Sequence, residues 1–272
     1  MFGYGIGNVY IQPYAKLLGT TRSVFVRGVV MCALIGITAI PSLLHVHDWR
    51  AVLAAFGVGV LGYLPLLTFT QGLKTSRISV VVPIAGSSPL ITVLLTALFL
   101  HVHLHGVQWL GVLVILAANI AVSVNVRSLR DSNALKLGSG IPYGLLTALG
   151  WGLVFFLIIY PTRSIGPWLS AFLLEFGVLV GAGIHITLRG GDYGWKYLTS
   201  RLTIVNALLI GGGTLAFTVG VRYFNVGLVA ALGNSMAAVS VIGATLVHHE
   251  RLTKKEKVLA ACMVLGVIAI TL

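Results

Sequence analysis

Two stretches of the sequence match each other and set the architecture: GYGIGNVYIQPYAKLLG at Gly3–Gly19 and GWGLVFFLIIYPTRSIG at Gly150–Gly166. The apolar segments that follow them also coincide when the chain is shifted by about 147 to 150 residues, a comparison that reveals internal duplication. The sequence therefore predicts two copies of one unit, in residues 1–126 and 140–272. The linker between them, 127–139, is rich in Ser, Asn, Asp and Lys, as a joint between two units should be.

The composition excludes a water-soluble domain. Of the 272 residues, 57% are hydrophobic and 9% are charged, whereas soluble domains carry about 25% charged residues. Apolar runs of about 20 residues recur along the chain, and a helix of that length crosses the roughly 30 Å hydrocarbon core of a bilayer. We therefore expect an all-α integral membrane protein whose surroundings are the lipid bilayer.

We expect ten transmembrane helices, five in each copy. Because five is an odd number, the two copies must cross the membrane in opposite directions, which gives the inverted repeat typical of many secondary transporters. The expected helices cover residues 1–19, 22–41, 51–71, 79–100, 106–126, 140–161, 166–188, 203–223, 227–248 and 256–272.

The first of these helices is short. Residues 140–149 precede GWG in the second copy, but only Met1 and Phe2 precede GYG in the first. We interpret this as a start site assigned too late, a truncated chain, or a helix to which a locally thinned bilayer adapts.

The net charge of +12 does not indicate a nucleic-acid partner, because the basic residues form no face with interleaved aromatic residues. Most Lys and Arg residues fall in the loops after the odd-numbered helices, whereas Arg50, Arg163 and Arg222 fall on the other side. The positive-inside rule then predicts that the first set is cytoplasmic and that both termini are outside.

Polar residues recur every fourth position within several spans, and therefore lie on one face of each helix. Such faces either line a water-filled path or join neighbouring helices by hydrogen bonds. The faces comprise Tyr4, Asn8, Gln12 and Lys16; Ser88, Thr92 and Thr96; Asn119, Ser123 and Arg127; and Thr214, Thr218 and Arg222.

From these faces we predict a central substrate cavity between the two copies. Trp151 takes the place of Tyr4 in the second copy, and aromatic rings at such a position can stack on an amphipathic solute. The predicted lining residues are Tyr4, Asn8, Gln12, Tyr63, Ser88, Trp151, Thr218 and Asn234.

Two charged residues, Arg27 and Glu175, lie well inside predicted spans at nearly equivalent places in the two copies. An unpaired charge in the bilayer core costs at least about 2.5 kcal/mol, so each needs a partner or water. We predict that they form a conformation-dependent bridge near the midplane, with Glu175 as the candidate for a coupling proton. The alternatives are that Arg27 extends to the loop or binds only backbone carbonyls, while Glu175 meets hydroxyl groups.

No cofactor, metal site or catalytic activity is expected. Cys32 and Cys262 lie in apolar runs as small packing residues, and no nucleophile or metalloprotease motif occurs. The alternative of a zinc site rests on His45, His47 and Asp48, which should share a membrane side with His101, His103 and His105. Ordinary interfacial histidines explain the same pattern.

Several of these stretches together resemble the EamA-type branch of the drug/metabolite transporter superfamily, over nearly the whole chain. The resemblance rests on the GYG and GWG entries, on Arg27, on VVPIAGSSPLITVLL with Pro83 and Pro89, and on the Glu-Arg-Leu turn at Glu250–Leu252. The chain departs from the family pattern at HVHLHGVQ (101–108), where that turn is expected in the first copy, and at Ala231 and Ala237, which replace the prolines in the second.

The resemblance implies a ten-helix carrier that works by alternating access, often as an exporter of amino acids or related metabolites. It also implies a multi-pass protein of the plasma or inner cell membrane, although such carriers are more usually described with both termini inside. The alternatives are a lipid-linked metabolite flippase of the same superfamily and a membrane scaffold without transport activity. The partners are then a small-molecule solute and the bilayer, with proton coupling and the oligomeric state left open.

Overall fold

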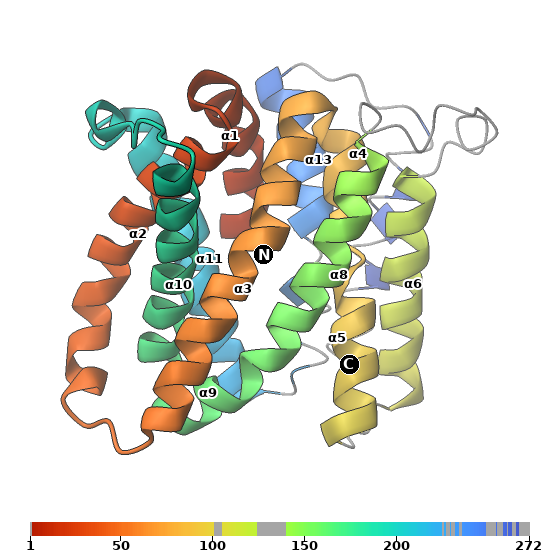
Figure 1. The fold of residues 1–272 in the computed structure, drawn as a ribbon. Coiled ribbons are helices and arrows are strands. Elements are labelled where there is room, and N and C mark those ends of the chain that lie inside the picture. The colour runs from red at the N-terminus through yellow and green to blue at the C-terminus, as the bar shows by residue number, and fades with distance from the viewer. Residues whose placement is uncertain are drawn as a thin grey trace.

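The protein is a bundle of helices, shown by a computed structural model in Figure 1. The structure describes residues 2–100, 105–123 and 140–224, and beyond them residues 226, 229, 232–233, 236–248, 254, 258–259, 261–262 and 265–266. Every regular element in these residues is a helix, as the apolar runs predict.

The helices in the predicted first copy are α1 (Phe2–Leu18), α2 (Thr20–Leu43), α3 (Trp49–Thr75), α4 (Ile78–Ala85), α5 (Ser88–Leu100) and α6 (Gly106–Ser123). The described helices of the second are α8 (Ile141–Leu157), α9 (Ile159–Ile165), α10 (Pro167–Leu188), the short η2 (Trp195–Tyr197), α11 (Arg201–Tyr223) and α13 (Met236–His248).

Within the described residues, six helical segments are long and apolar enough to cross a membrane. They are Thr20–Leu43, Trp49–Thr75, Val80–Leu100, Ile141–Ile165, Pro167–Leu188 and Arg201–Tyr223. Helices α1, α6 and α13 lie within three more of the predicted spans, and most of the predicted span 256–272 lies outside the described residues. The multi-pass membrane architecture is thus supported, and the number ten remains a prediction.

Two of the predicted helices are interrupted. Residues 79–100 form α4 and α5 with a turn at Gly86 and Ser87 between them, and α8 gives way to α9 at Ile158. Each first segment ends four residues before a proline, Ala85 before Pro89 and Leu157 before Pro161. The proline ring clashes with the carbonyl at that position and cannot donate to it, so the continuous helices expected there are corrected to broken ones.

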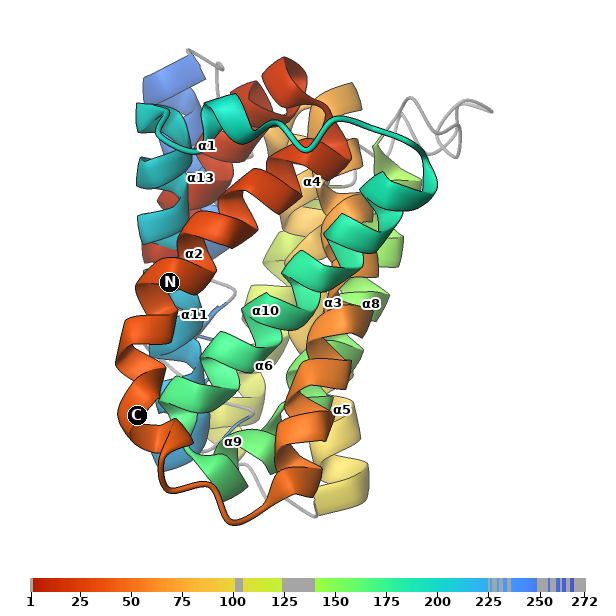
Figure 2. The ribbon, with the colours of Figure 1, turned by 60° about the vertical axis from the view of Figure 1, so that its left-hand side comes forward.

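The helices that follow the two matching glycines, α2 and α10, run in opposite directions. Figures 1 and 2 show α2 descending from the upper edge of the bundle while α10 ascends to it. Gly19 and Gly166, which precede these helices at matching sequence positions, share φ 84° and ψ 165°, a conformation that glycine adopts without a Cβ clash. The inverted repeat itself remains a prediction.

A pair of side-chain contacts also recurs between the copies. The Ser240 hydroxyl donates to the Gly5 carbonyl at 2.9 Å, and the Thr92 hydroxyl donates to the Gly152 carbonyl at 3.0 Å. In this way α1 of the first copy packs on α13 of the second, and α8 of the second packs on α5 of the first. Helices of each predicted copy therefore pack directly on helices of the other.

The outer surface is apolar, as lipid contact requires. Large side chains on the outside of the helices are well exposed, among them Ile37, Leu53, Leu98 and Leu188. The basic ends of α1, α3 and α10, with the start of α11, lie together at the upper edge in Figure 1. This agrees with the predicted clustering of basic loops on one side.

Candidate functional site

A cavity of about 90 Å³ lies in the middle of the bundle, between helices of the two predicted copies. Helices α1, α2 and α3 of the first copy and α8, α10, α11 and α13 of the second contribute to it. The lining residues are Tyr4, Asn8, Ile11, Arg27, Gly62, Leu66, Phe69, Trp151, Val154, Phe155, Leu174, Glu175, Val178, Ile210, Thr214 and Met236.

The cavity contains two opposite charges. Arg27 of α2 is 4% exposed and Glu175 of α10 is 7% exposed, and both line the cavity. The two helices approach closely here, since a Cβ added to Gly28 would lie 3.3 Å from the Leu179 side chain. Arg27 and Glu175 are the charged residues among the buried ones that the structure describes.

These two charges do not form a direct ion pair. No guanidinium nitrogen of Arg27 lies within 4.0 Å of the Glu175 carboxylate, the distance that defines a salt bridge. The Arg27 Nε is buried and has no hydrogen-bond partner among the described residues. A buried donor in this condition is costly. Arg27 lines the cavity, and a guanidinium forms strong hydrogen bonds to anionic groups.

Glu175 is held from the other side by hydroxyl groups. The Thr214 hydroxyl of α11 donates to Glu175 Oε1 at 2.7 Å, and the Tyr4 hydroxyl of α1 donates to Thr214 Oγ1 at 3.0 Å. The first distance is in the range of a bond to a charged acceptor. Three helices from both copies therefore meet at one carboxylate.

The remaining wall is aromatic and aliphatic. Trp151 of α8 packs against Phe69 of α3 with ring centroids 4.7 Å apart. The ring centroid of Phe155 lies 6.3 Å from that of Trp151. Asn8 adds an amide group whose Nδ2 lies 3.9 Å from Met236 Sδ. The cavity thus pairs polar groups from α1, α2, α10 and α11 with aromatic rings from α3 and α8, which suits an amphipathic molecule.

Five of the residues predicted for the site line this cavity: Tyr4, Asn8, Arg27, Trp151 and Glu175. Arg27 and Glu175 line the same cavity, as predicted, but they do not form a bridge in this structure. The bridge stays a prediction for another conformation. Asn234 lies outside the described residues.

Four other predicted lining residues lie elsewhere. Gln12 donates to the carbonyls of Leu73 and Ser76 at the end of α3. Thr218 donates to the carbonyls of its own helix. Ser88 is fully buried beside α8. Gln12 and Thr218 thus show the other expected role of intramembrane polar residues, which is to join or complete helices, whereas the buried Ser88 hydroxyl has no hydrogen-bond partner among the described residues.

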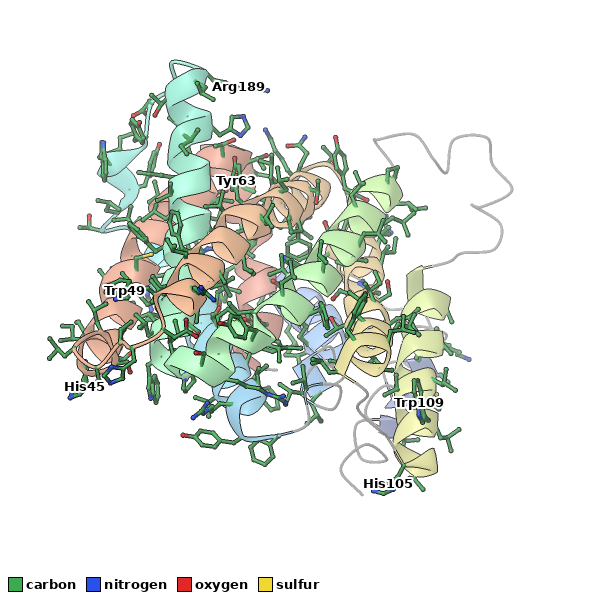
Figure 3. The ribbon with its side chains drawn as sticks, turned by 60° about the horizontal axis from the view of Figure 1, so that its bottom comes forward. His45, Trp49, Tyr63, His105, Trp109 and Arg189 are labelled. Atoms are coloured by element: carbon green, nitrogen blue, oxygen red, sulfur yellow. The ribbon has the colours of Figure 1, made fainter. Side chains whose placement is uncertain are left out.

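Tyr63, the fourth of them, is bonded to α10 through its hydroxyl, which lies 2.6 Å from His185 Nδ1. Its ring also meets the His185 ring edge to face, with centroids 5.9 Å apart. Figure 3 places Tyr63 on α3 toward the end of the bundle that carries Arg189, away from Trp49 and His45. Tyr63 therefore joins the two copies beyond the cavity.

Sequence reasoning missed Thr214, Phe69 and Phe155. Thr214 belongs to the predicted polar face of its helix, but the predicted cavity lining includes Thr218, one turn further, in its place. Phe155 lies four residues after Trp151 and so on the same helical face. That spacing could have identified it.

A second hollow lies where the loop between α2 and α3 meets the end of α9. It is lined by Ser42, His45, Val46, His47, Asp48, Ser164 and Ile165. Asp48 accepts hydrogen bonds there from Ser164 at 2.5 Å and from Tyr160 at 3.0 Å. Within the described residues no three His, Cys, Asp or Glu side chains are grouped to hold a metal ion. His101 and His103 of the zinc alternative lie outside those residues.

The model of the EamA-like transporter family matches this chain over residues 1–124 and 138–272. Among solved structures, the chain is similar to one described as "Crystal structure of protein", with a TM-score of 0.67 and 18% identity over 99% of this chain and 95% of that one. This likeness concerns the fold alone. No curated protein matches the chain.

Proposed function

Because the chain belongs to the EamA-like transporter family, we propose that it carries small organic metabolites across the membrane by alternating access. The favoured substrates are amino acids and related solutes, moved outward across the plasma or inner cell membrane. The observation that supports this best is the pair of unbridged charges, Arg27 and Glu175, beside an aromatic wall in one buried cavity.

An amino acid offers complementary groups to each part of this cavity. Its carboxylate can accept hydrogen bonds from the Arg27 guanidinium, which is the strongest carboxylate binder among side chains. Its ammonium group can donate to Glu175, and an apolar side chain can pack on Trp151 and Phe69. A zwitterion thus supplies the missing partner of both buried charges at once, which a solute with a single charge cannot do.

Polar contacts between the two copies occur on both sides of the cavity, and they support alternating access. The end of α1 and the start of α11 lie toward the upper edge in Figure 1. There the Thr203 hydroxyl of α11 donates to the Tyr14 hydroxyl of α1 at 2.9 Å. At the lower edge the Ser164 hydroxyl donates to Asp48. In the proposal, the copies 1–126 and 140–272 rock against each other, breaking one group of contacts while the other stays closed.

Glu175 is also the residue that we propose for a coupling proton, because it is a carboxylic acid within a span and is reached from the cavity. The test is a pH-sensitive dye enclosed in proteoliposomes. Addition of the transported amino acid should change the internal pH with the wild-type protein and leave it constant with Glu175→Gln. An equal change with both proteins would remove the proton role.

The proposed function is tested by counterflow in proteoliposomes that contain the purified protein. Vesicles loaded with an unlabelled amino acid should accumulate the radiolabelled one, and a labelled lipid in the same vesicles should stay in its leaflet. Movement of the lipid without counterflow would favour the flippase, and absence of both would favour the scaffold.

A further inference from the structure

The hydroxyl group of Thr214 stands between three other groups. It accepts a hydrogen bond from the Tyr4 hydroxyl at 3.0 Å. Its own oxygen lies 2.7 Å from Glu175 Oε1 and 3.3 Å from the Ile210 carbonyl of the preceding helical turn. Thr214 is 2% exposed, so water does not replace these contacts.

A threonine hydroxyl has one hydrogen atom and can donate it to only one of the two acceptors. The shorter distance and the charge of a carboxylate favour Glu175 over the Ile210 carbonyl. The incoming bond from Tyr4 occupies a lone pair of Thr214 Oγ1 and so helps to turn its hydrogen toward Glu175. The carboxylate is thereby tied to α11.

Arg27 on α2 is the group that competes with Thr214 for this carboxylate. The guanidinium and the carboxylate share the cavity, yet they lie beyond salt-bridge distance and Arg27 Nε has no partner among the described residues. Without the bond to α11, a direct pair with Arg27 is the natural alternative for Glu175.

We propose that Thr214, oriented by Tyr4, is a positioning residue that holds the Glu175 carboxylate away from Arg27, so that both charges stay available to one zwitterionic solute. This inference rests on the proposed function. Loss of the Thr214 hydroxyl would let the two charges pair with each other, and a solute would then have to break that pair in order to bind.

The experiment compares Thr214→Val, which keeps the shape of the side chain and removes the hydroxyl, with Thr214→Ser, which retains the hydroxyl. Thr70→Val is the matched control, because Thr70 is equally buried, donates only to the carbonyl of Leu66 in its own helix, and does not line the cavity. In counterflow, we expect Thr214→Val to raise KM about tenfold, equivalent to about 1.4 kcal/mol, and to leave the maximal rate largely intact. Thr214→Ser and Thr70→Val should keep the wild-type KM.

A second readout needs no transport. The infrared carboxylate band of Glu175, assigned by its loss in Glu175→Gln, should shift in solute-free Thr214→Val and stay in place in Thr70→Val. An unchanged band and an unchanged KM in Thr214→Val would overturn the inference. If the wild-type protein moved no amino acid, the proposed function would fail, while the band comparison would still decide whether Thr214 positions Glu175.

Discussion

Arg27 and Glu175 face one buried cavity from α2 and α10 without forming an ion pair. Two opposite charges in the bilayer core would normally be expected to neutralise each other, because each is costly alone. Here Glu175 is bonded to Thr214, and Arg27 Nε lacks a partner among the described residues. In the proposed function, both charges are therefore available to a bound solute.

The first prediction concerns which polar residues face the cavity. In a background with Cys32 and Cys262 replaced by Ala, a cysteine at Asn8 should react with a small water-soluble thiol reagent, because Asn8 lines the cavity. Cysteines at Gln12 and Thr218 should react far more slowly, because those side chains do not line the cavity and instead bond to helix backbones. Labelling rates followed by mass spectrometry provide the measurement, and equal rates at all three positions would contradict the cavity described here.

A second prediction tests the aromatic wall. Replacement of Trp151 by Leu should weaken the affinity for aromatic solutes about threefold to tenfold, since an aromatic pair adds about 0.5–1.5 kcal/mol beyond area burial. Small solutes such as alanine should be affected less. Trp168→Leu serves as the control, because Trp168 is 41% exposed on the outside of the bundle and does not line the cavity. KM values for both solutes in counterflow give the answer, and an equal loss for both would assign Trp151 a structural role only.

A third prediction concerns the packing between the predicted copies. A Cβ at Gly152 would lie 2.7 Å from the Ser88 carbonyl and 2.5 Å from Ile91 Cβ, so Gly152→Ala must push α8 away from α5. We expect the free energy of unfolding to fall by about 1–3 kcal/mol. Gly212→Ala, where no atom lies within 4 Å of the added Cβ, should leave stability unchanged or raise it. Unfolding in mixed detergent micelles measures both, and equal stability of the two variants would count against the close packing.

The fourth prediction concerns pH at the lower edge of the bundle. Hydrogen bonds from the Ser164 side chain, the Ala51 backbone N–H and the Tyr160 hydroxyl hold the pKa of Asp48 below its ordinary value. Because the pKa is lowered in the folded protein, the stabilisation is complete above the ordinary aspartate pKa of about 4 and is lost as the pH falls through the lowered value. The melting temperature of Asp48→Asn should therefore lie below the wild type at pH 7, and the gap should narrow in acid.

The control for this prediction is Ser164→Ala, alone and combined with Asp48→Asn. If the two residues act through their shared hydrogen bond, the effects of the two changes will not add. Full additivity, or a gap that stays constant into acid, would show that Asp48 stabilises the protein in another way.

Much of the fold could be predicted from the sequence, because apolar runs of bilayer length leave few alternatives to membrane helices. The repeat also allowed Arg27 and Glu175 to be placed at similar depths in opposite copies. A proline blocks the carbonyl four residues earlier, yet Pro13, Pro41 and Pro65 lie inside unbroken helices, so the breaks before Pro89 and Pro161 could not be predicted from proline alone.

The exact lining of the cavity could not be predicted in the same way. Thr214 and Thr218 lie on one helical face, and only their depth in the bundle decides that the first meets Glu175 while the second meets its own backbone. Likewise, Tyr63 and Gly62 are neighbours, yet Gly62 lines the cavity and Tyr63 turns to His185. Helix rotation and depth depend on packing between distant segments, which periodicity alone does not define.

The central claim, that Arg27 and Glu175 bind the two charges of one solute, is tested most directly by counterflow with three related compounds. These are an amino acid, the amine that lacks its carboxylate and the acid that lacks its ammonium group. The wild-type protein should exchange the amino acid far faster than either analogue, and Arg27→Gln and Glu175→Gln should each lose that preference. Equal exchange of all three compounds by the wild type, with no change in either variant, would contradict the account.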